Sequence, residues 1–375
     1  MAPPLTRRTA LSLAATAAAA AAVGPAAAAP ARDAPHPHLD RTLTRIAFGS
    51  CADQSKAQPI WEAVLASRPD LFVFLGDNIY ADTRDMAVVE AKYGMLAAKP
   101  GFRRLRETTP LAAIWDDHDF GEDDAGGDYP MKAGTRERFC DFWSEPPDSP
   151  RRSRDGVYAS YLFGPPGRRV QLILPDLRWN RSPLEKIELN GQDYRAWATE
   201  RFKAGKSVPG PYQRNPDLHA SMLGETQWRW LEAQLRQPAD LRILGSSLQV
   251  LSDFAGWEGW ANFARDQARL FQAIRDARAD RLVCISGDTH FGEVSMLDVN
   301  VPYPIWDITS SGLTEVWPVT PPNALRVGEV WRDRNFGLIE IDWSGRAPVL
   351  KIEVRDEQGQ PRLSQAIDTR RLSVS

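Results

Sequence analysis

The amino-acid sequence predicts a layered α/β fold. Several short, continuous apolar runs end in glycine or polar residues, which is typical of strands buried on both faces. Segments with helical periodicity lie between these runs, and two segments joined by a short turn near the end of the chain predict a hairpin. With 43% hydrophobic and 25% charged residues over 375 positions, the composition excludes coiled coils, collagen-like chains and largely disordered proteins.

The first 31 residues have the layout of an export signal. Their only charges are Arg7 and Arg8, which precede a long alanine-rich stretch. This order predicts a cleavable twin-arginine-type signal peptide over residues 1–31. A membrane anchor is the alternative, but Gly24 and Pro25 interrupt the stretch before the roughly 20 apolar residues that a span needs. We therefore expect export by the twin-arginine machinery to a secreted, periplasmic or cell-wall location, with no membrane span elsewhere.

Residues 32–44 read as a linker, and residues 45–375 as one catalytic domain built from alternating elements. Buried strands are expected at 45–50, 70–76, 111–115, 170–174, 241–244, 282–286 and 305–309. Helices are expected where apolar residues recur with helical period, at 59–67, 86–96 and 226–235.

Three further segments complete this organisation. Residues 121–130 contain Gly126-Gly127 and predict a loop. The pattern weakens over residues 178–223, which we interpret as an insertion or lid. Residues 335–343 and 349–354, joined by Ser344-Gly345, predict a C-terminal β-hairpin over 335–355.

Charge and cysteine content narrow the possible partners. The net charge of −3 and the pI of about 6 imply no nucleic-acid partner.

Three cysteines in an exported chain argue against a disulfide framework. Cys284 lies in an apolar run and Cys140 in a predicted helix, so both are expected in the core. Cys51 follows a strand and is a candidate metal ligand, with a buried free thiol as the alternative.

Polar clusters follow four of the predicted buried strands. They are Gly49–Cys51, Gly76–Asp82, Asp116–Asp119 and Ser286–His290. Ligands of open α/β sheets bind beyond the carboxyl ends of the strands, so these clusters are expected to converge on one crevice. Carboxylates packed together repel each other strongly unless cations neutralise them. The sequence therefore predicts a metal site.

The candidate ligand residues narrow the identity of the metal but leave several metals possible. Of five histidines, His36 and His38 lie in the linker and His219 in the insertion, which leaves His118 and His290. Carboxylate oxygens favour calcium, manganese or ferric iron. A cysteine thiolate suits iron or zinc, and a tyrosinate three residues after an aspartate suits ferric iron.

Four motifs carry a resemblance to a known family. They are Phe48-Gly49-Ser50-Cys51, Leu75-Gly76-Asp77-Asn78-Ile79-Tyr80-Ala81-Asp82, Trp115-Asp116-Asp117-His118-Asp119-Phe120-Gly121 and Ser286-Gly287-Asp288-Thr289-His290. In this order they resemble the signature blocks of the PhoD-like alkaline phosphatases, a branch of the calcineurin-like metallophosphatases. Flanking stretches, including Thr309–Leu313, match as well, so the resemblance covers roughly residues 45–315. It implies a four-layer α-β-β-α sandwich, a multinuclear metal centre and hydrolysis of phosphomonoesters or phosphodiesters.

The resemblance also implies roles for individual residues. A ferric site would be made by Cys51, Asp77, Tyr80 and His290, with Asp77 bridging to a second ion. That second, divalent ion is expected to be calcium, with manganese or zinc as alternatives, and would be held by Asp117, Asp288 and, as a weaker candidate, Asp116. His118 resembles the catalytic histidine that contacts the phosphoryl oxygen or the leaving group.

The chain departs from the family pattern at two places. It has Asp123-Asp124 where relatives commonly have Asn-Asp, which adds a carboxylate near the ions. The mid-chain histidine of the wider superfamily is absent, and Ser247 or Gln249 stands near its expected place.

The expected mechanism is hydrolysis by a hydroxide that bridges two cations, which lower the pKa of water toward neutrality. A protonated His118 would supply the proton of the leaving oxygen. Arg178 is a candidate phosphate clamp, with a surface or core-bridging arginine as the alternative. Candidate substrate-binding residues are Asn78, Gln249 and Trp257, the last in a Gly-rich stretch that is able to wall a pocket.

Two other functions compete with this interpretation. A phospholipase-type phosphodiesterase would need an exposed apolar lid in the insertion, where Trp179 and Phe202 occur but no amphipathic stripe is present. A non-catalytic exported protein that binds metal or phosphate would need the ligands without His118, which this chain retains.

Overall fold

The structure is a computed structural model and describes residues 40–215, 217 and 219–374. The predicted signal peptide and residues 32–39 of the predicted linker lie outside these ranges. The rest of that linker already belongs to the folded unit, because Leu43 is buried and the backbone N–H of Thr44 donates to Asp70 Oδ2 at 2.8 Å.

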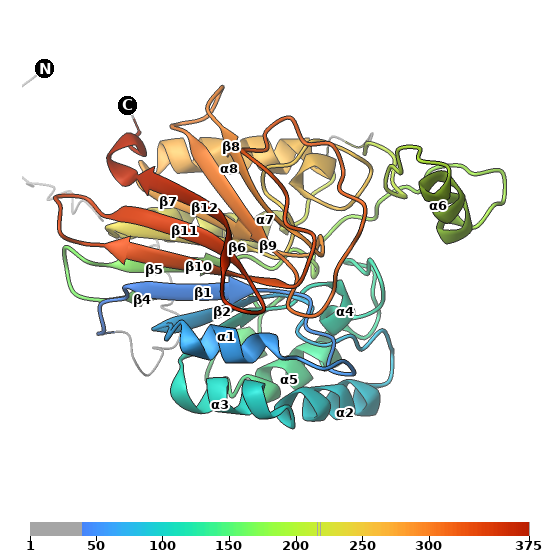
Figure 1. The fold of residues 1–375 in the computed structure, drawn as a ribbon, viewed down its shortest axis with the longest axis horizontal. Coiled ribbons are helices and arrows are strands. Elements are labelled where there is room, and N and C mark those ends of the chain that lie inside the picture. The colour runs from blue at the N-terminus through green and yellow to red at the C-terminus, as the bar shows by residue number, and fades with distance from the viewer. Residues whose placement is uncertain (1–39, 216, 218, 375) are drawn as a thin grey trace, which may run out of the picture. The chain divides into compact units, whose positions relative to one another are not determined.

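Two six-stranded mixed sheets form the centre of the fold (Figure 1). The first sheet has the order β12-β11-β10-β1-β2-β3, with β1 (Arg45–Gly49), β2 (Leu71–Leu75), β3 (Leu111–Ile114), β10 (Asn335–Asp342), β11 (Val349–Asp356) and β12 (Pro361–Asp368). The second has the order β4-β5-β6-β7-β9-β8, with β4 (Ala159–Phe163), β5 (Val170–Leu174), β6 (Leu241–Ser246), β7 (Leu282–Ser286), β8 (Gly292–Leu297) and β9 (Ile305–Ser310).

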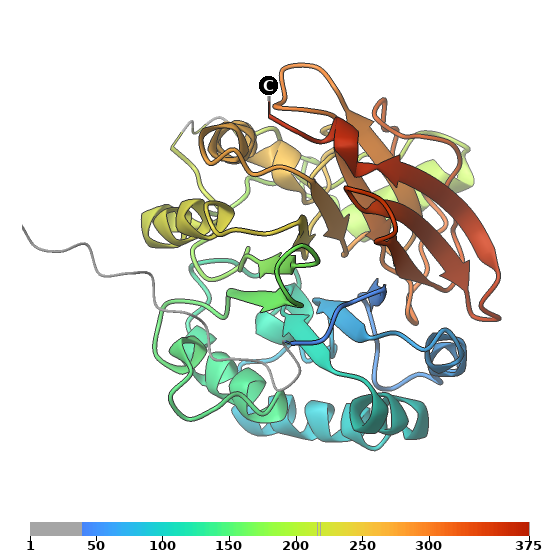
Figure 2. The ribbon, with the colours of Figure 1, turned by 90° about the vertical axis from the view of Figure 1, so that its left-hand side faces the viewer.

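Helices cover the outer faces of the two sheets (Figures 1 and 2). On the side of the first sheet lie α1 (Ile60–Ala66), α2 (Met86–Ala97), α3 (Pro100–Thr108), the short α4 (Asp117–Phe120) and α5 (Lys132–Phe142). On the side of the second lie α7 (Gly224–Leu235) and α8 (Ala264–Asp276). Single 3₁₀ turns occur at Pro150–Arg152, Trp260–Asn262 and Thr369–Arg371. The four-layer α-β-β-α arrangement implied by the resemblance is therefore confirmed.

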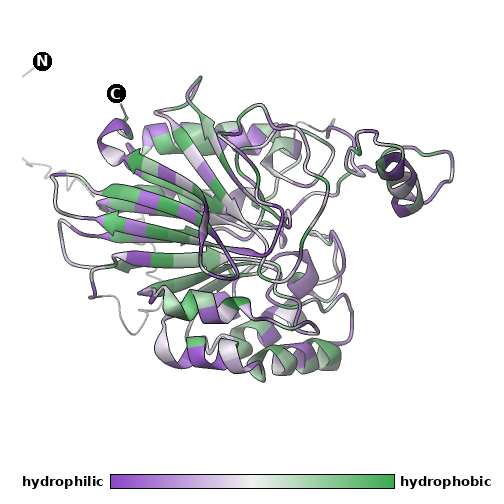
Figure 3. Ribbon diagram, viewed as in Figure 1, coloured by the Kyte–Doolittle hydropathy of each residue, from purple (hydrophilic) through white to green (hydrophobic). Residues whose placement is uncertain are grey.

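Apolar packing holds the layers together. The ring of Trp61 on α1 packs edge-on against Phe72 of β2 and Phe102 of α3, with centroids 5.7 and 6.0 Å away. A Cβ on Gly245 of β6 would lie 2.5 Å from a methyl carbon of Leu174 on the neighbouring β5 and 3.0 Å from one of Leu75 in the first sheet, so only glycine allows this close approach. Figure 3 shows hydrophobic residues concentrated in the strands.

The strands that carry the motifs run parallel, as their continuous burial suggested. β1, β2 and β3 pair in parallel in the first sheet, and β5, β6, β7 and β9 do so in the second. The predicted hairpin is present, because β10 and β11 pair antiparallel over eight residue pairs. It is not the end of the sheet, however. β12 adds a further strand, and β10 pairs with β1 in the centre.

The predicted insertion contains one helix, α6 (Tyr194–Lys203), which extends away from the sheets (Figure 1). None of its residues is buried, and most of them are hydrophilic (Figure 3). The insertion begins inside the core, since Arg178, Trp179 and Arg181 are buried. Within the described ranges, we find no helix whose length and apolarity would suffice to cross a membrane.

Candidate metal centre

The loops that follow β1, β2, β3 and β7 meet at one edge of the two sheets. They bring together side chains far apart in the sequence, and Cys51 Sγ lies 3.7 Å from the backbone oxygen of Asp288. Tight turns aim these side chains: Cys51, Asp77, Asp288 and His290 have φ angles of 64°, 49°, 73° and 61°. Such left-handed conformations in non-glycine residues are costly and concentrate at functional sites.

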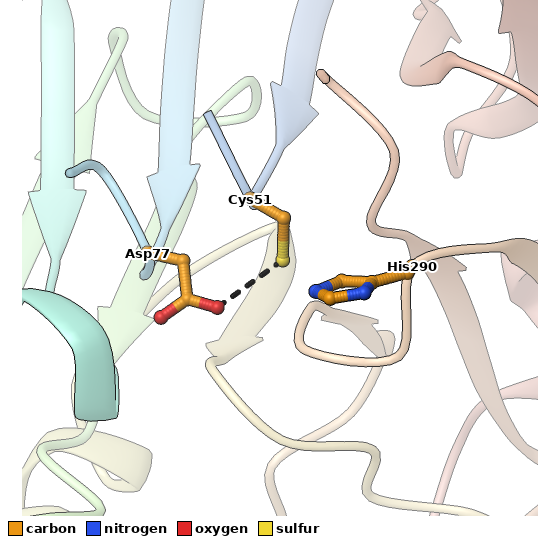
Figure 4. A group of neighbouring side chains, drawn as sticks. All are labelled: Cys51, Asp77 and His290. Atoms are coloured by element: carbon orange, nitrogen blue, oxygen red, sulfur yellow. Dashed lines mark hydrogen bonds between the residues drawn. The ribbon is translucent and has the colours of Figure 1, made fainter. Parts of the chain in front are cut away.

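Cys51, Asp77 and His290 form the first group of candidate ligands (Figure 4). Their ligand atoms all lie within 4.8 Å of one another, and the Cys51 thiol donates to Asp77 Oδ2 at 3.3 Å. Ser311, which directly follows β9, contacts this first group. Its hydroxyl lies 3.2 Å from Cys51 Sγ and accepts a hydrogen bond from the backbone N–H of His290.

Tyr80 reaches the same group from the other side. Its hydroxyl lies 3.2 Å from His290 Nε2, and burial raises the pKa of this phenol. The structure therefore brings together all four side chains of the predicted ferric site. A thiol, a phenol, a carboxylate and an imidazole form a donor set that suits ferric iron, which accepts both the hard oxygen ligands and the sulfur.

A second group of four carboxylates adjoins the first. Its members are Asp77, Asp116, Asp117 and Asp288, and their ligand oxygens also lie within 4.8 Å of one another. Asp77 belongs to both groups, which is the position expected of a carboxylate that bridges two ions. All-oxygen ligands suit calcium, magnesium or manganese.

The electrostatics of the second group favour cations. Burial raises the pKa values of Asp77 and Asp288, and neighbouring carboxylates raise them further, chiefly Asp117 for Asp77 and Asp116 for Asp288. Within the described chain, the buried atoms Asp77 Oδ1 and Asp116 Oδ2 have no hydrogen-bond partner. Burial also lowers the pKa of His290 to about 4, which keeps the imidazole neutral and available as a ligand. These residues therefore fit bound metal ions.

His118 stands at the edge of a pocket of about 750 Å³ that opens beside these groups. Its Nδ1 lies 2.7 Å from Asp82 Oδ1, and its ring packs against Tyr80 with centroids 4.2 Å apart. Burial lowers the pKa of His118, but the carboxylates of Asp117, Asp77 and Asp82 outweigh it and raise the pKa well above its ordinary value. These carboxylates therefore favour the protonated form of the imidazole, which is able to donate a proton.

Arg178 differs from the predicted phosphate clamp. It is fully buried, and its Nε donates to Asp116 Oδ1 at 2.6 Å while one terminal nitrogen lies 2.8 Å from Glu258 Oε2. It is not among the residues that line the pocket. This geometry corresponds to the core-bridging alternative: the guanidinium neutralises and orients carboxylates of the second group.

The three predicted substrate-binding residues occupy different environments. Asn78 is fully buried outside the pocket, where its amide donates to Ile114 O and Asp119 Oδ2. Gln249 lines the pocket, but its amide donates to Glu293 Oε1 at 2.6 Å. Trp257 lines the pocket and is partly exposed to it. Substrate contacts of Gln249 and Trp257 remain predictions, whereas Asn78 is buried and does not line the pocket.

Several positioning residues were missed at the level of sequence. Asp119 accepts hydrogen bonds from the backbone N–H groups of Asp77 and Asp116, so it ties two ligand-bearing loops together. Glu258 pairs with both Arg178 and Arg181. Asp119 lies inside one of the four family motifs, so its role could have been predicted from the sequence. No pattern around Glu258 predicts its ion pair with Arg178, which lies 80 residues earlier in the chain. A further acidic group comprises Asp117, Asp123 and Asp124.

Comparisons with solved structures show the same fold. The chain is similar to a structure of PhoD, with 12% identity, coverage of 90% of this chain and 73% of that one, and a TM-score of 0.60. It is also similar to a dimetal phosphatase from Danio rerio, with 15% identity, coverage of 88% and 100%, and a TM-score of 0.50. GAP50, the anchor in the inner membrane complex of Plasmodium, has 13% identity, coverage of 89% and 90%, and the same TM-score of 0.50. A search of curated protein sequences gives no match.

The fold, the two ligand groups and the match to a phosphatase family together define a metal-dependent phosphoesterase. The sequence profile of the PhoD-like phosphatases matches residues 46–323, which is most of the chain. The protein belongs to the PhoD-like phosphatase family and is a phosphoric ester hydrolase.

Proposed function

We propose that this protein is an exported hydrolase of phosphomonoesters or phosphodiesters with two adjacent metal sites. The proposal assigns a ferric ion to Cys51, Asp77, Tyr80 and His290. It assigns a divalent ion, calcium in the first place, to Asp77, Asp116, Asp117 and Asp288. The observation that carries it is the position of Asp77 in both ligand groups, because two cations that share one carboxylate lie close enough to act on one phosphoryl group.

The bound ions would supply an activated water and neutralise charge on the phosphoryl oxygens. In the overall step, water adds to phosphorus, the bond from phosphorus to the ester oxygen breaks, and that oxygen leaves as the alcohol after taking a proton. His118 is placed to give this proton, because it borders the pocket and Asp82 fixes its ring through Nδ1. Its other nitrogen, Nε2, lies 4.0 Å from Asp117 Oδ2 and 3.9 Å from Asp123 Oδ1, beyond hydrogen-bond distance, and is the atom that we assign to the substrate.

The proposal of export rests on the sequence of residues 1–31, with its arginine pair and alanine-rich stretch. Export by the twin-arginine route carries folded proteins, and this suits a site assembled from four loops before the protein leaves the cytoplasm. Replacement of Arg7 and Arg8 by lysine is expected to retain the protein in the cell. Immunoblots of cell and culture fractions would measure this, and unchanged export would contradict the proposed route.

Elemental analysis of the purified protein, combined with assays on p-nitrophenyl phosphate and bis-p-nitrophenyl phosphate, tests the function. Stoichiometric iron and a second metal, with turnover of at least one ester, would support the proposal. The Asp77→Asn variant is expected to lose both metals in part and activity by at least about a hundredfold. Asp298→Asn, an exposed carboxylate outside the pocket, is the matched control. Bound metal without turnover of either ester would contradict the proposed activity, and zinc in place of iron would contradict the ferric site.

A further inference from the structure

The pocket beside the metal centre has two chemically different sides. One side carries the candidate ligands and His118. The other is lined mainly by rings and prolines from three segments that are distant in sequence: α6 with the residues after it, residues 255–258, and the loop at 317–323. It also carries the charged side chains of Lys186, Arg195 and Asp253. The second side therefore presents flat apolar surfaces within reach of any ester held at the metal ions.

Three aromatic residues on this second side form a continuous row, which we call the aromatic wall (Tyr194, Trp257 and Trp317). Tyr194 meets Trp257 edge-on with centroids 6.0 Å apart, and Trp257 meets Trp317 edge-on with centroids 6.1 Å apart. The backbone N–H of Trp317 donates to the carbonyl of His290 at 3.1 Å. The wall thus begins at the backbone of a candidate ligand and runs outward to α6.

The wall is exposed where a substrate would meet it. Trp317 is 40% exposed, and Phe202 of α6, which lines the same pocket, is 51% exposed. Large apolar side chains that remain open at the mouth of a pocket are typical of ligand-binding surfaces. Because aromatic rings offer flat faces and edges, they bind planar groups better than flexible chains of the same size.

Buried polar networks fix the loops that carry the wall. Glu293 is buried and pairs with Arg326 at 2.6 Å, while Asn323 donates to both Glu293 and Ser295, which anchors the loop after Trp317. The loop of Trp257 is held by Glu258 and by backbone hydrogen bonds between residues 210–212 and 255–256. A wall held in this way binds a ligand with little further loss of conformational entropy.

We infer that the aromatic wall is a leaving-group subsite, and that it selects phosphoesters whose alcohol carries a planar aromatic group. The inference rests on the proposed function, because it assigns the specificity of the same site. Long acyl chains suit it less well. Most of the apolar lining consists of rings and prolines, with Val208 and Val319 as the only branched aliphatic side chains among the described lining residues.

A comparison of 2-naphthyl phosphate with phenyl phosphate tests the inference, because the two alcohols have similar acidity and differ mainly in ring area. The wild-type enzyme is expected to prefer the naphthyl ester by about tenfold in kcat/KM. In Trp317→Ala and in Trp257→Ala this preference is expected to fall to about twofold or less. Trp343→Ala, which removes a partly buried tryptophan directly after β10 that does not line the pocket, is the matched control and should keep the preference.

A binding measurement separates recognition from turnover. Calorimetric titration with 2-naphthylphosphonate and phenylphosphonate, which are not hydrolysed, should show the same preference and the same loss in the two pocket variants. Circular dichroism and melting temperature would confirm that each variant is folded, and Trp317→Phe, which keeps a ring, should retain part of the preference.

The outcomes distinguish the inference from the function on which it rests. Absence of turnover of every ester by the metal-loaded protein would overturn the proposed function. Turnover without naphthyl preference, or a preference that survives in both pocket variants, would overturn the aromatic wall alone. If phosphatidylglycerol vesicles were hydrolysed faster than naphthyl phosphate, and if Trp317→Ala lost this activity, the wall would bind a lipid leaving group. That outcome would overturn its assignment to planar aromatic groups.

Discussion

The hydroxyl of Tyr80 lies 3.2 Å from Nε2 of His290, while the ring of Tyr80 packs against His118. One side chain therefore contacts both a candidate metal ligand and the candidate proton donor. Tyr80 follows Asp77 by three residues in the loop after β2, so a single loop supplies the shared carboxylate and the phenol. Loss of the hydroxyl and loss of the ring should accordingly have different effects.

We expect Tyr80→Phe to remove the phenolate-to-iron charge-transfer band while leaving the iron bound, because Cys51, Asp77 and His290 remain as ligands. Activity should fall by at least about tenfold, since the ring still supports His118 but one ligand is missing. Absorption spectra and elemental analysis of the same sample would measure both effects. An unchanged band would show that Tyr80 is not a ligand.

Replacement of His118 by glutamine should lower kcat by about a hundredfold to ten-thousandfold without reducing metal content. The loss should be larger for phenyl phosphate than for p-nitrophenyl phosphate, because the poorer leaving group needs the proton more. Asp82→Asn keeps the imidazole but weakens its support at 2.7 Å and is expected to have a smaller effect of about tenfold. Equal losses on both esters would contradict the role of His118 as proton donor.

Chelation should destabilise the protein as well as inactivate it. Without cations, the carboxylates of Asp77, Asp117 and Asp288 lie close together and repel each other, and bound ions stabilise only the folded state. Calorimetry with and without chelator is expected to show a melting temperature lower by about 5 °C or more. In Asp288→Asn the decrease should be smaller, because one carboxylate is neutral. A melting temperature that stays constant while the metals are removed would contradict the site.

The buried position of Arg178 predicts a role in stability. Arg178→Lys loses the two-sided contact with Asp116 and Glu258, and is expected to lower the free energy of unfolding by about 3 kcal/mol. Arg195→Lys is the control, because Arg195 is exposed at the pocket and should change stability by less than about 0.5 kcal/mol. Urea unfolding would measure both. A raised KM for p-nitrophenyl phosphate with unchanged stability would instead support the phosphate clamp.

A second buried arginine gives a pH-dependent prediction. Arg151 is buried and pairs with Glu145 at 2.6 Å. Burial raises the pKa of Glu145, but Arg151 outweighs it and holds the pKa below its ordinary value. A carboxyl whose pKa is lowered on folding stabilises the protein above its unfolded pKa, and this contribution is lost as the pH falls through the folded pKa.

Glu145→Gln should therefore lower the free energy of unfolding by about 2 kcal/mol at pH 7, and the difference from wild type should shrink below about pH 4. Urea unfolding of both proteins at pH 7, 5 and 3.5 would measure it. A difference that does not change with pH would show that the pairing contributes through packing rather than charge.

The sequence was informative where local pattern and burial coincide. The parallel strands of the core could be predicted because each is a continuous apolar run followed by a polar motif. β12 was missed because Ile367 is its only buried residue, so it shows no apolar pattern. α8 could have been predicted, since its buried residues Leu270 and Ile274 have helical spacing.

Some residues of the candidate site could also be predicted from the sequence, and others could not. Cys51, Asp77 and His290 stand directly after strands, so their convergence follows from sheet topology. The partners of Arg178 do not, because Asp116 and Glu258 approach it from loops 62 residues before it and 80 residues after it. Sequence alone therefore left open whether Arg178 faces substrate or carboxylates, and only its burial decides this.

The assembly of the site from distant loops has a consequence for how the protein is monitored. Cys51 and Asp288 are 237 positions apart, and β1, which directly precedes the loop of Cys51, is held between β2 and the late strand β10. Non-local pairings of this kind form slowly, and no short part of the chain holds a full set of ligands. Metal content therefore reports on whether the whole fold has formed. In a truncated or incompletely folded chain, we expect a loss of bound metal to be detected before any loss of secondary structure.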